Sequence, residues 1–213
     1  MKDRAIIFGK GFVGEATARA FDLDVEWHDP HKGLGAKDWS APYAFICVPT
    51  PGDQFGLDTS AVSECLRHLR MNKYEGTIVI RSTCPPGALQ AFAKLYGDVI
   101  YFPEFLRERF AFYDALHPHL VVMGGNKTRP FELWLRKKNH GGTAKWFVTD
   151  IQTAGSIKLG LNTALAAKVA LFNALHEFAE TSHADWSVMS DAIASDWRIG
   201  QDRKSTRLNS SHT

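Results

Sequence analysis

The chain has little cysteine, no excess of one charge and no long apolar run, and each shortage excludes a class of protein. Its three cysteines, at 47, 65 and 84, form no C-x-x-C pair, which argues against a disulfide framework and favours free thiols in a reducing cytoplasm. The net charge is +2 without a basic stripe, so no nucleic-acid partner is expected. No apolar run approaches the length of about 18 residues that marks a membrane span, and no signal peptide is recognisable. His117 and His119 lack a further ligand cluster, so no metal site is predicted.

A glycine-rich turn follows the first apolar run. Gly9, Gly11 and Gly14 form the pattern G-x-G-x-x-G between a strand pattern at 5–8 and a helix pattern at 13–21. Such glycines permit the turn, the approach of a pyrophosphate and close helix–strand packing, and the helix N-terminus binds the phosphates. Asp29, twenty residues after Gly9, suits the adenosine ribose. We therefore predict an NAD site; the alternative is a structural turn with a surface aspartate. The expected ligands here are Gly9, Gly11, Phe12, Val13, Gly14 and Asp29.

Short apolar runs alternate with helical patterns over the first 150 residues. The runs lie at 5–8, 24–28, 43–48, 77–80, 99–102, 120–123 and 146–148, and further helices are expected at 59–71, 86–96 and 128–138. Runs without polar alternation indicate strands that are buried on both faces. The pattern predicts an α/β domain over residues 1–150, with a doubly wound, Rossmann-like and mostly parallel sheet.

The pattern changes after residue 150. No proline interrupts 151–182, and the segment predicts one long helix that opens a second, helical domain over 151–201. Apolar residues cover most of its circumference, so it needs partners on more than one side, and we expect a homodimer through 151–182. A shorter helix is expected at 186–194. Residues 202–213 are polar and aperiodic, and are expected to form a disordered or non-native tail.

Three loops at expected strand ends carry polar residues, at the edge where an open parallel sheet binds ligands. They are Val48-Pro49-Thr50-Pro51, Arg81-Ser82-Thr83-Cys84-Pro85-Pro86-Gly87 and Pro103-Glu104-Phe105-Leu106-Arg107-Glu108. Hydroxyls come from Thr50, Ser82 and Thr83, and carboxylates from Glu104 and Glu108. Each loop alone is as easily a turn or a solvated face, with Arg107 and Arg109 pairing with the glutamates at the surface.

Together these residues resemble the UDP-glucose/GDP-mannose dehydrogenase family. The resemblance includes the glycine turn, the three loops, Lys158 with Asn162, and the segment Asp196, Arg198, Ile199 and Gly200, and it extends over about residues 1 to 200. It implies an NAD-dependent enzyme that oxidises the C6 alcohol of a nucleotide sugar to a carboxylate, through two hydride transfers and a covalent adduct of a catalytic cysteine. The resemblance places Val48, Pro49, Thr50, Ser82 and Thr83 at the cofactor, and Thr83, Glu104, Glu108, Lys158 and Asn162 at the substrate. An amine and an amide one helical turn apart suit an oxyanion at C6.

The chain departs from the family pattern in three places. Gly155 and Ala174 stand where the family has glutamate. The family's cysteine in a glycine-rich loop after the Gly200 segment has no counterpart, so we expect a truncated and inactive chain. Cys84 is expected to be structural, because no base or cation is identifiable beside it. The alternatives are a non-catalytic NAD-binding or dimerisation module and another β-hydroxyacid-type dehydrogenase; the sugar is not predictable.

Overall fold

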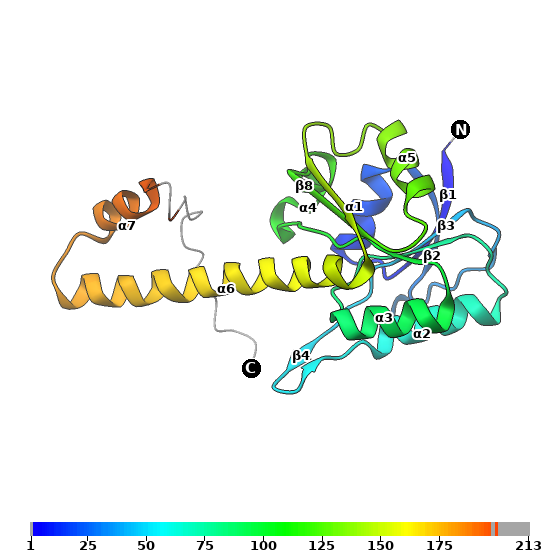
Figure 1. Ribbon diagram of the computed structural model, residues 1–213, viewed down its shortest axis with the longest axis horizontal. Coiled ribbons are helices and arrows are strands. Elements are labelled where there is room, and N and C mark those ends of the chain that lie inside the picture. The colour runs from blue at the N-terminus through cyan, green and yellow to red at the C-terminus, as the bar shows by residue number, and fades with distance from the viewer. Residues whose placement is uncertain (1, 197–198, 200–213) are drawn as a thin grey trace. The chain divides into compact units, whose positions relative to one another are not determined.

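The computed structural model describes residues 2–196 and residue 199 (Figure 1). The chain divides into two compact units, Met1–Leu159 and Gly160–Thr213, so the division falls inside the long helix α6 (Ile151–Thr181). The domain limits expected from the sequence put the division at the start of that helix. The expected tail at 202–213, together with Arg198 and Gly200, lies outside the described residues.

A seven-stranded sheet forms the centre of the first unit. All neighbouring strands are parallel except β7 and β8, which pair antiparallel through Tyr101 and Gly124. The prediction of a Rossmann-like, mostly parallel sheet is therefore confirmed. In spatial order the strands are β2 (Leu23–His28), β1 (Asp3–Phe8), β3 (Tyr43–Ile46), β6 (Thr77–Ile80), β7 (Val99–Tyr101), β8 (Leu120–Gly124) and β9 (Lys145–Thr149).

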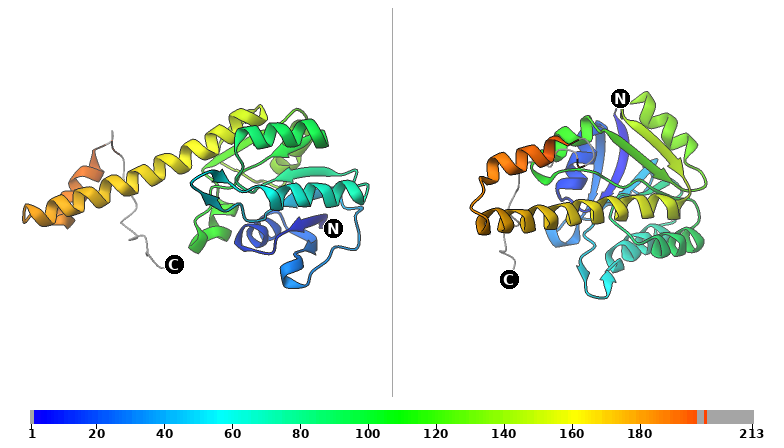
Figure 2. Two further views of the ribbon diagram at one scale, coloured as in Figure 1. Left: turned by 90° about the horizontal axis from the view of Figure 1, so that it is seen from below. Right: turned by 60° about the vertical axis from the view of Figure 1, so that its left-hand side comes forward.

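Helices cover both faces of this sheet (Figures 1 and 2). One face packs against α2 (Ser60–Met71) and α3 (Pro86–Tyr96), and the other against α1 (Phe12–Ala20) and α5 (Arg129–Lys137). The short helix α4 (Ala111–Leu116) packs on α1 through Ala16, Ala111 and Ala115. Successive strand residues enter opposite cores: Ile6 and Phe8 face α2 and α3, whereas Ala5 and Ile7 face α1 and α5. Burial on both faces explains the continuous apolar runs.

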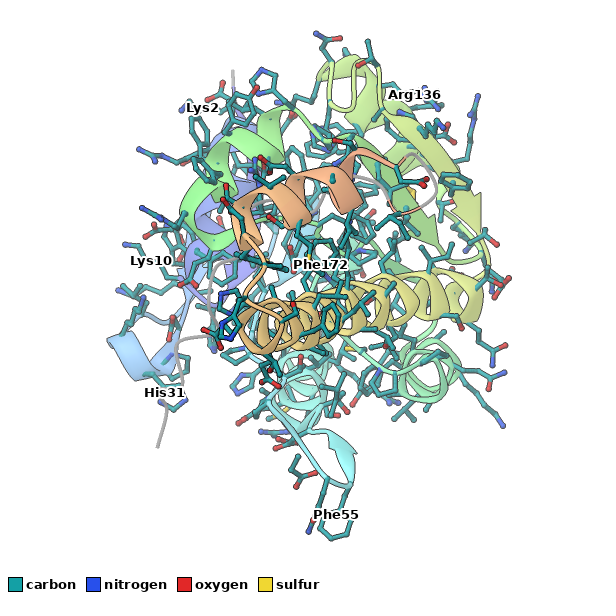
Figure 3. All side chains as sticks on the ribbon, turned by 90° about the vertical axis from the view of Figure 1, so that its left-hand side faces the viewer. Lys2, Lys10, His31, Phe55, Arg136 and Phe172 are labelled. Carbon is teal, nitrogen blue, oxygen red and sulfur yellow. The ribbon has the colours of Figure 1, made fainter. Side chains whose placement is uncertain are left out.

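Several short elements have no counterpart in the sequence pattern. They are the hairpin of β4 (Gly52–Asp53) and β5 (Gly56–Leu57), the 3-10 helices η1 (Pro30–Lys32) and η2 (Glu108–Phe110), and α4. The hairpin turns at Asp53, whose carboxylate accepts hydrogen bonds from the N–H groups of Phe55 (2.8 Å) and Gly56 (3.2 Å). Phe55 is 88% exposed at its tip (Figure 3). Elements of two to six residues are too short to carry a recognisable period.

The second unit contains the remainder of α6 and α7 (Trp186–Ser195). Asp185 caps α7 by accepting hydrogen bonds from the N–H groups of Ser187 and Val188. The ring of Trp186 packs edge-on against Phe172 and His176 of α6, at centroid distances of 6.3 and 5.0 Å. Phe172 is buried, but most apolar side chains of α6 in this unit are exposed; they include Leu161, Leu165, Leu171 and Phe178. In the described part of the chain, no helix has the length and apolar character needed to span a membrane.

Candidate functional site

The glycine turn between β1 and α1 has the geometry that a dinucleotide requires. Gly9 has φ of +89°, and a Cβ there would lie 2.5 Å from the carbonyl oxygen of Cys47. A Cβ at Gly14 would lie 2.2 Å from the carbonyl oxygen of Gly9. Only glycine fits at these two positions. A Cβ at Gly11 would meet no atom within 4 Å, so the turn has open space at this position.

The N-terminus of α1 offers backbone donors at this opening. Its N-cap is Gly11, and no side chain caps the helix. The first N–H groups of a helix, here those of Phe12 and Val13, have no partner within the helix and carry partial positive charge. Such groups bind phosphate. The residues present therefore fit the pyrophosphate of a dinucleotide.

Asp29 lies directly after β2, beside the same turn. Its Oδ2 accepts a hydrogen bond from the N–H of Lys10 at 2.9 Å, so the carboxylate also fixes the backbone of the turn. The ammonium group of Lys32 donates to the carbonyl oxygen of Lys10 in the same turn. The spacing between Gly9 and Asp29 predicts that Asp29 binds a ribose. It does not predict the hydrogen bond between Asp29 and the Lys10 N–H, because a sequence does not show which backbone groups a side chain reaches.

The loops after β3 and β6 are tied to each other. The hydroxyl of Ser82 is buried and donates to the carbonyl oxygen of Val48 at 2.7 Å. Ser82 therefore lies at the strand end where the sequence predicts a cofactor ligand. Its hydroxyl hydrogen is already donated to Val48, so only the hydroxyl oxygen is left to interact with a cofactor. Thr50 and Thr83 are half-buried at the same edge of the sheet, and Pro49 is exposed.

Lys158 of α6 and Glu104 of the loop after β7 form a buried pair. The Lys158 Nζ donates to the Glu104 carbonyl oxygen at 2.6 Å and to Oε1 at 3.2 Å. The other carboxylate oxygen, Oε2, accepts from the N–H of Leu106 at 2.6 Å. Lys158 is only 5% exposed, and the ring of Phe105 covers its ammonium at 5.2 Å. Burial of the ammonium is tolerated because a carboxylate and a carbonyl compensate its charge.

The other predicted catalytic residues are not joined to this pair. Glu108 is exposed at the first position of η2. Asn162 is exposed one turn beyond Lys158 along α6 and belongs to the second unit. The structure thus brings together two of the five residues, Glu104 and Lys158, from positions 54 apart in the sequence.

The loop that carries Glu104 is held by an ion pair between Arg107 and Asp114, which the sequence analysis did not predict. Arg107 does not pair with the glutamates; its Nε and Nη2 donate to the two carboxylate oxygens of Asp114 at 2.8 and 2.5 Å. The backbone N–H of Arg107 donates to the same carboxylate at 2.9 Å. A bidentate arginine–carboxylate pair fixes both distance and orientation. Asp114 lies in α4, which has no recognisable pattern.

The three thiols are all buried and free. Burial raises the pKa of Cys47 to about 11 and those of Cys65 and Cys84 to about 12. A thiolate, not a thiol, is the nucleophile and the metal ligand. A buried thiol with a raised pKa is poorly suited to act as a nucleophile, which supports the expectation that Cys84 is structural. Among the described residues, no group of three or more histidine, cysteine, aspartate or glutamate side chains could hold a metal ion.

Gly155, one of the departures from the family pattern, marks a close contact between α6 and α3. A Cβ at this position would lie 2.7 Å from Cδ1 of Leu89 and 3.4 Å from Cα of Pro86. A glutamate would therefore require the buried Leu89 side chain or one of the two helices to shift. Ala174, the other departure on α6, is exposed in the second unit.

Two family models match this chain, one after the other. The first describes the NAD binding domain of the UDP-glucose/GDP-mannose dehydrogenase family and matches residues 36–135. The second describes the central domain of the same family and matches residues 152–208. The first match begins after the glycine turn, so the geometry of that turn supports a dinucleotide independently. NAD is the cofactor that this domain of the family binds, as predicted.

Curated relatives agree with these matches. The UDP-glucose 6-dehydrogenase of Campylobacter jejuni is 29% identical over 173 residues, which make up 76% of this chain and 43% of that protein. The UDP-glucose 6-dehydrogenase of Rickettsia bellii is 37% identical over 170 residues, or 73% of this chain and 38% of that protein. The chain thus spans less than half the length of these relatives.

Solved structures of related enzymes share the fold. A GDP-mannose dehydrogenase from Pseudomonas aeruginosa, solved as a ternary complex, superposes with a TM-score of 0.76 at 25% identity, covering 91% of this chain and 57% of that chain. A UDP-glucose dehydrogenase from Pyrobaculum islandicum has a TM-score of 0.78 at 23% identity, covering 94% and 58%. The sequence matches and the shared fold confirm the resemblance: the chain belongs to the UDP-glucose/GDP-mannose dehydrogenase family.

Proposed function

We propose that this chain carries the NAD-binding and lysine-bearing part of an enzyme that oxidises the C6 alcohol of a nucleotide sugar to a carboxylate. The observation that carries the proposal is the buried Lys158–Glu104 pair. Glu104 follows β7, and the glycine turn follows β1, a strand of the same parallel stretch of the sheet. Loops after parallel strands lie at one edge of the sheet, which is where open α/β sheets bind their ligands.

The geometry of Lys158 suits an oxygen on the reacting carbon. An ammonium group has three N–H donors, and two of those of Lys158 are directed at Glu104, which leaves one for a substrate oxygen. A fixed positive charge in a buried site stabilises negative charge that develops on that oxygen. When bound, NAD accepts the hydride from C6. In this proposal Thr83, Glu108 and Asn162 complete the substrate side, and Val48, Pro49, Thr50 and Ser82 line the cofactor.

We further propose a homodimer through residues 151–182 and a location in the cytoplasm. The exposed leucines of α6 support the dimer, since an apolar helix in water is stabilised by a partner. The free thiols favour a reducing compartment. The same thiols also support a rival function, a non-catalytic NAD-binding module, because all three are buried and none is placed as a nucleophile.

Measurement of NADH formation distinguishes the dehydrogenase from the non-catalytic NAD-binding module. We expect the chain as given to bind NAD but to form no steady NADH with UDP-glucose, GDP-mannose or related sugars. A longer protein that joins this chain to a glycine-rich loop with a cysteine should form NADH with at least one nucleotide sugar and lose this activity in Lys158→Met. No NADH with any sugar from such a protein would favour the non-catalytic module. Steady NADH from the short chain, abolished by Cys84→Ala, would show that Cys84 is the nucleophile.

A further inference from the structure

His28, the last residue of β2, connects two parts of the candidate NAD site. Its backbone carbonyl oxygen accepts a hydrogen bond from the N–H of Gly9, in the glycine turn, at 3.0 Å. Its ring Nδ1 accepts a hydrogen bond from the N–H of Ala36, in the segment that follows Asp29, at 3.3 Å. A ring nitrogen accepts a hydrogen bond only when it carries no proton, so the neutral ring of His28 carries its proton on Nε2.

The loop between Asp29 and Leu34 is closed at its base by backbone hydrogen bonds. The N–H of Asp29 donates to the carbonyl oxygen of Leu34 at 2.9 Å, and the N–H of Leu34 donates to the carbonyl oxygen of Asp29 at 3.0 Å. This pair is an isolated bridge, and residues 35–42 belong to no strand or helix. The position of the segment after Leu34 therefore depends on other contacts.

Two side chains of β2 provide such contacts. Glu26 Oε1 accepts a hydrogen bond from the N–H of Lys37 at 2.8 Å, in an exposed position. The bond from Ala36 to His28 is partly buried. Water competes less well for a partly buried bond, so we expect His28 to contribute more than Glu26 to holding this segment.

The ring of His28 is itself held in place by three other rings. Its centroid lies 5.0 Å from that of Phe8, 5.1 Å from that of His68 and 5.8 Å from that of Trp39. Phe8 belongs to β1 and His68 to α2. The packing thus keeps Nδ1 beside the Ala36 N–H.

The surroundings of His28 favour its neutral form. Burial lowers the pKa of His28, and the nearby His68 lowers it further. In the described part of the chain, the other titratable groups that act on the ring are Asp29 and Glu64 of α2, which raise the pKa but do not outweigh the first two effects. His28 is therefore neutral near pH 7 and becomes protonated at a pH below its ordinary pKa of 6.5. The added proton goes to Nδ1, where it faces the Ala36 N–H and removes the acceptor.

We propose that His28 is a positioning residue for NAD: its neutral ring holds the segment after Asp29 so that the Asp29 carboxylate is presented to the adenosine ribose, and protonation of the ring releases this segment. NAD binding should therefore weaken in mild acid. The inference rests on the assignment of Asp29 to the ribose. It involves only residues of the first unit and does not depend on turnover or on the identity of a sugar.

Two substitutions separate the acceptor from the charge. His28→Asn keeps an acceptor near the position of Nδ1 but cannot take up a proton, whereas His28→Leu offers neither. The affinity for NAD is measured by titration calorimetry from about pH 8 down to the lowest pH at which the chain remains folded. Loss of one hydrogen bond should weaken binding about 2- to 12-fold. Relative to His28→Asn, the wild type should lose this factor as the pH falls below 6.5, and His28→Leu should lack it at every pH. His183→Asn, at an exposed position of the second unit, should follow the wild type.

Amide hydrogen exchange of Ala36, measured by NMR without NAD, tests the contact itself. The protection factor of this amide should fall in acid in the wild type, persist in His28→Asn and be lost in His28→Leu. Equal protection in the wild type and His28→Leu would overturn the contact. Parallel pH curves of NAD affinity for the wild type and His28→Asn would overturn the role of protonation.

A His28→Leu variant that loses the protection of Ala36 but binds NAD as tightly as the wild type would overturn the positioning role. If His28→Leu does not fold, the comparison of the wild type with His28→Asn remains decisive. None of these measurements requires NADH formation, so a failure of the proposed dehydrogenase reaction would leave them unaffected.

Discussion

The ammonium group of Lys158 contacts both the backbone carbonyl and the carboxylate of Glu104, at 2.6 and 3.2 Å. These two contacts connect α6 to the loop after β7, so the pair stabilises the fold in addition to its proposed catalytic role. Lys158→Met leaves the Glu104 carboxylate partly buried without its cation, and breaking a buried pair in this way costs about 3 kcal/mol. We expect that loss of unfolding free energy in urea denaturation. The control is Lys137→Met at an exposed position, which should change the free energy of unfolding by no more than about 0.5 kcal/mol. Equal stability of the two variants would contradict a stabilising role of the Lys158–Glu104 pair.

Two glycines of the same turn should respond differently to alanine. A Cβ at Gly14 would lie 2.2 Å from the Gly9 carbonyl oxygen, so Gly14→Ala should destabilise the fold by about 1–3 kcal/mol and abolish NAD binding. A Cβ at Gly11 meets nothing within 4 Å, so Gly11→Ala should keep its stability and lose NAD affinity only. Thermal unfolding and titration calorimetry separate the two effects. A Gly11→Ala variant that binds NAD normally would mean that the pyrophosphate lies elsewhere.

The carboxylate of Asp29 should select NAD over NADP, because it accepts bonds from ribose hydroxyls and repels a 2′-phosphate. Titration calorimetry should give tighter binding of NAD than of NADP. Asp29→Ala should weaken NAD binding about 10- to 150-fold, since a hydrogen bond to a charged group contributes about 1.5–3 kcal/mol. Tighter binding of NADP, or an unchanged NAD affinity in the variant, would refute this assignment. Lys32, which lies beside the same turn, is the residue to test next in that case.

His140 should make the fold sensitive to mild acid. Burial, with a smaller contribution from Arg81, lowers its folded-state pKa to about 4 from the ordinary 6.5, so between these values the unfolded chain binds a proton that the folded chain does not. Stability contributed by neutral His140 is therefore present above pH 6.5 and is lost as the pH falls toward 4. The loss amounts to about 3 kcal/mol at most. Urea denaturation over this range should show a smaller pH dependence for His140→Gln than for the wild type. The exposed His183→Gln should behave as the wild type does.

Leu165 should lie in the proposed dimer interface. It is 63% exposed on α6 in the single chain. Leu165→Glu introduces a charge on this apolar surface and should shift the protein from dimer to monomer in light scattering. Lys168→Glu, a charge change one turn away on a half-buried position, should have a smaller effect. A wild type that remains a well-behaved monomer at high concentration would count against the dimer.

The sequence is sufficient to predict the regular elements, because most of them are long enough to carry a period. The apolar runs in β1, β3 and β6 are buried from both sides, and α6 begins and ends within one residue of the predicted span. The hairpin at β4 and β5 and the helix α4 are too short for this kind of reasoning. They matter nonetheless, because α4 supplies Asp114.

The site could be predicted only in part, for a different reason. The glycine pattern and Asp29 are close in sequence, so spacing alone locates them. The approach of Lys158 to Glu104 depends on how α6 crosses the sheet, and only the family resemblance suggested that both residues belong to the site. Arg81 was noted only as part of a loop, because nothing in a sequence tells whether an arginine extends into water or turns inward between Phe21 and Phe102.

Gly155 allows α6 to lie close to α3 on the turn before Lys158. A Cβ at this position would lie 2.7 Å from Cδ1 of the buried Leu89 and 3.4 Å from Cα of Pro86. A side chain at 155 would therefore displace the Leu89 side chain or move α6 away from α3. A movement of α6 by a few tenths of an ångström would stretch the 2.6 Å bond from Lys158 to the Glu104 carbonyl oxygen beyond its best length. The absence of a side chain at 155 thus permits the helix spacing at which Lys158 reaches its partner.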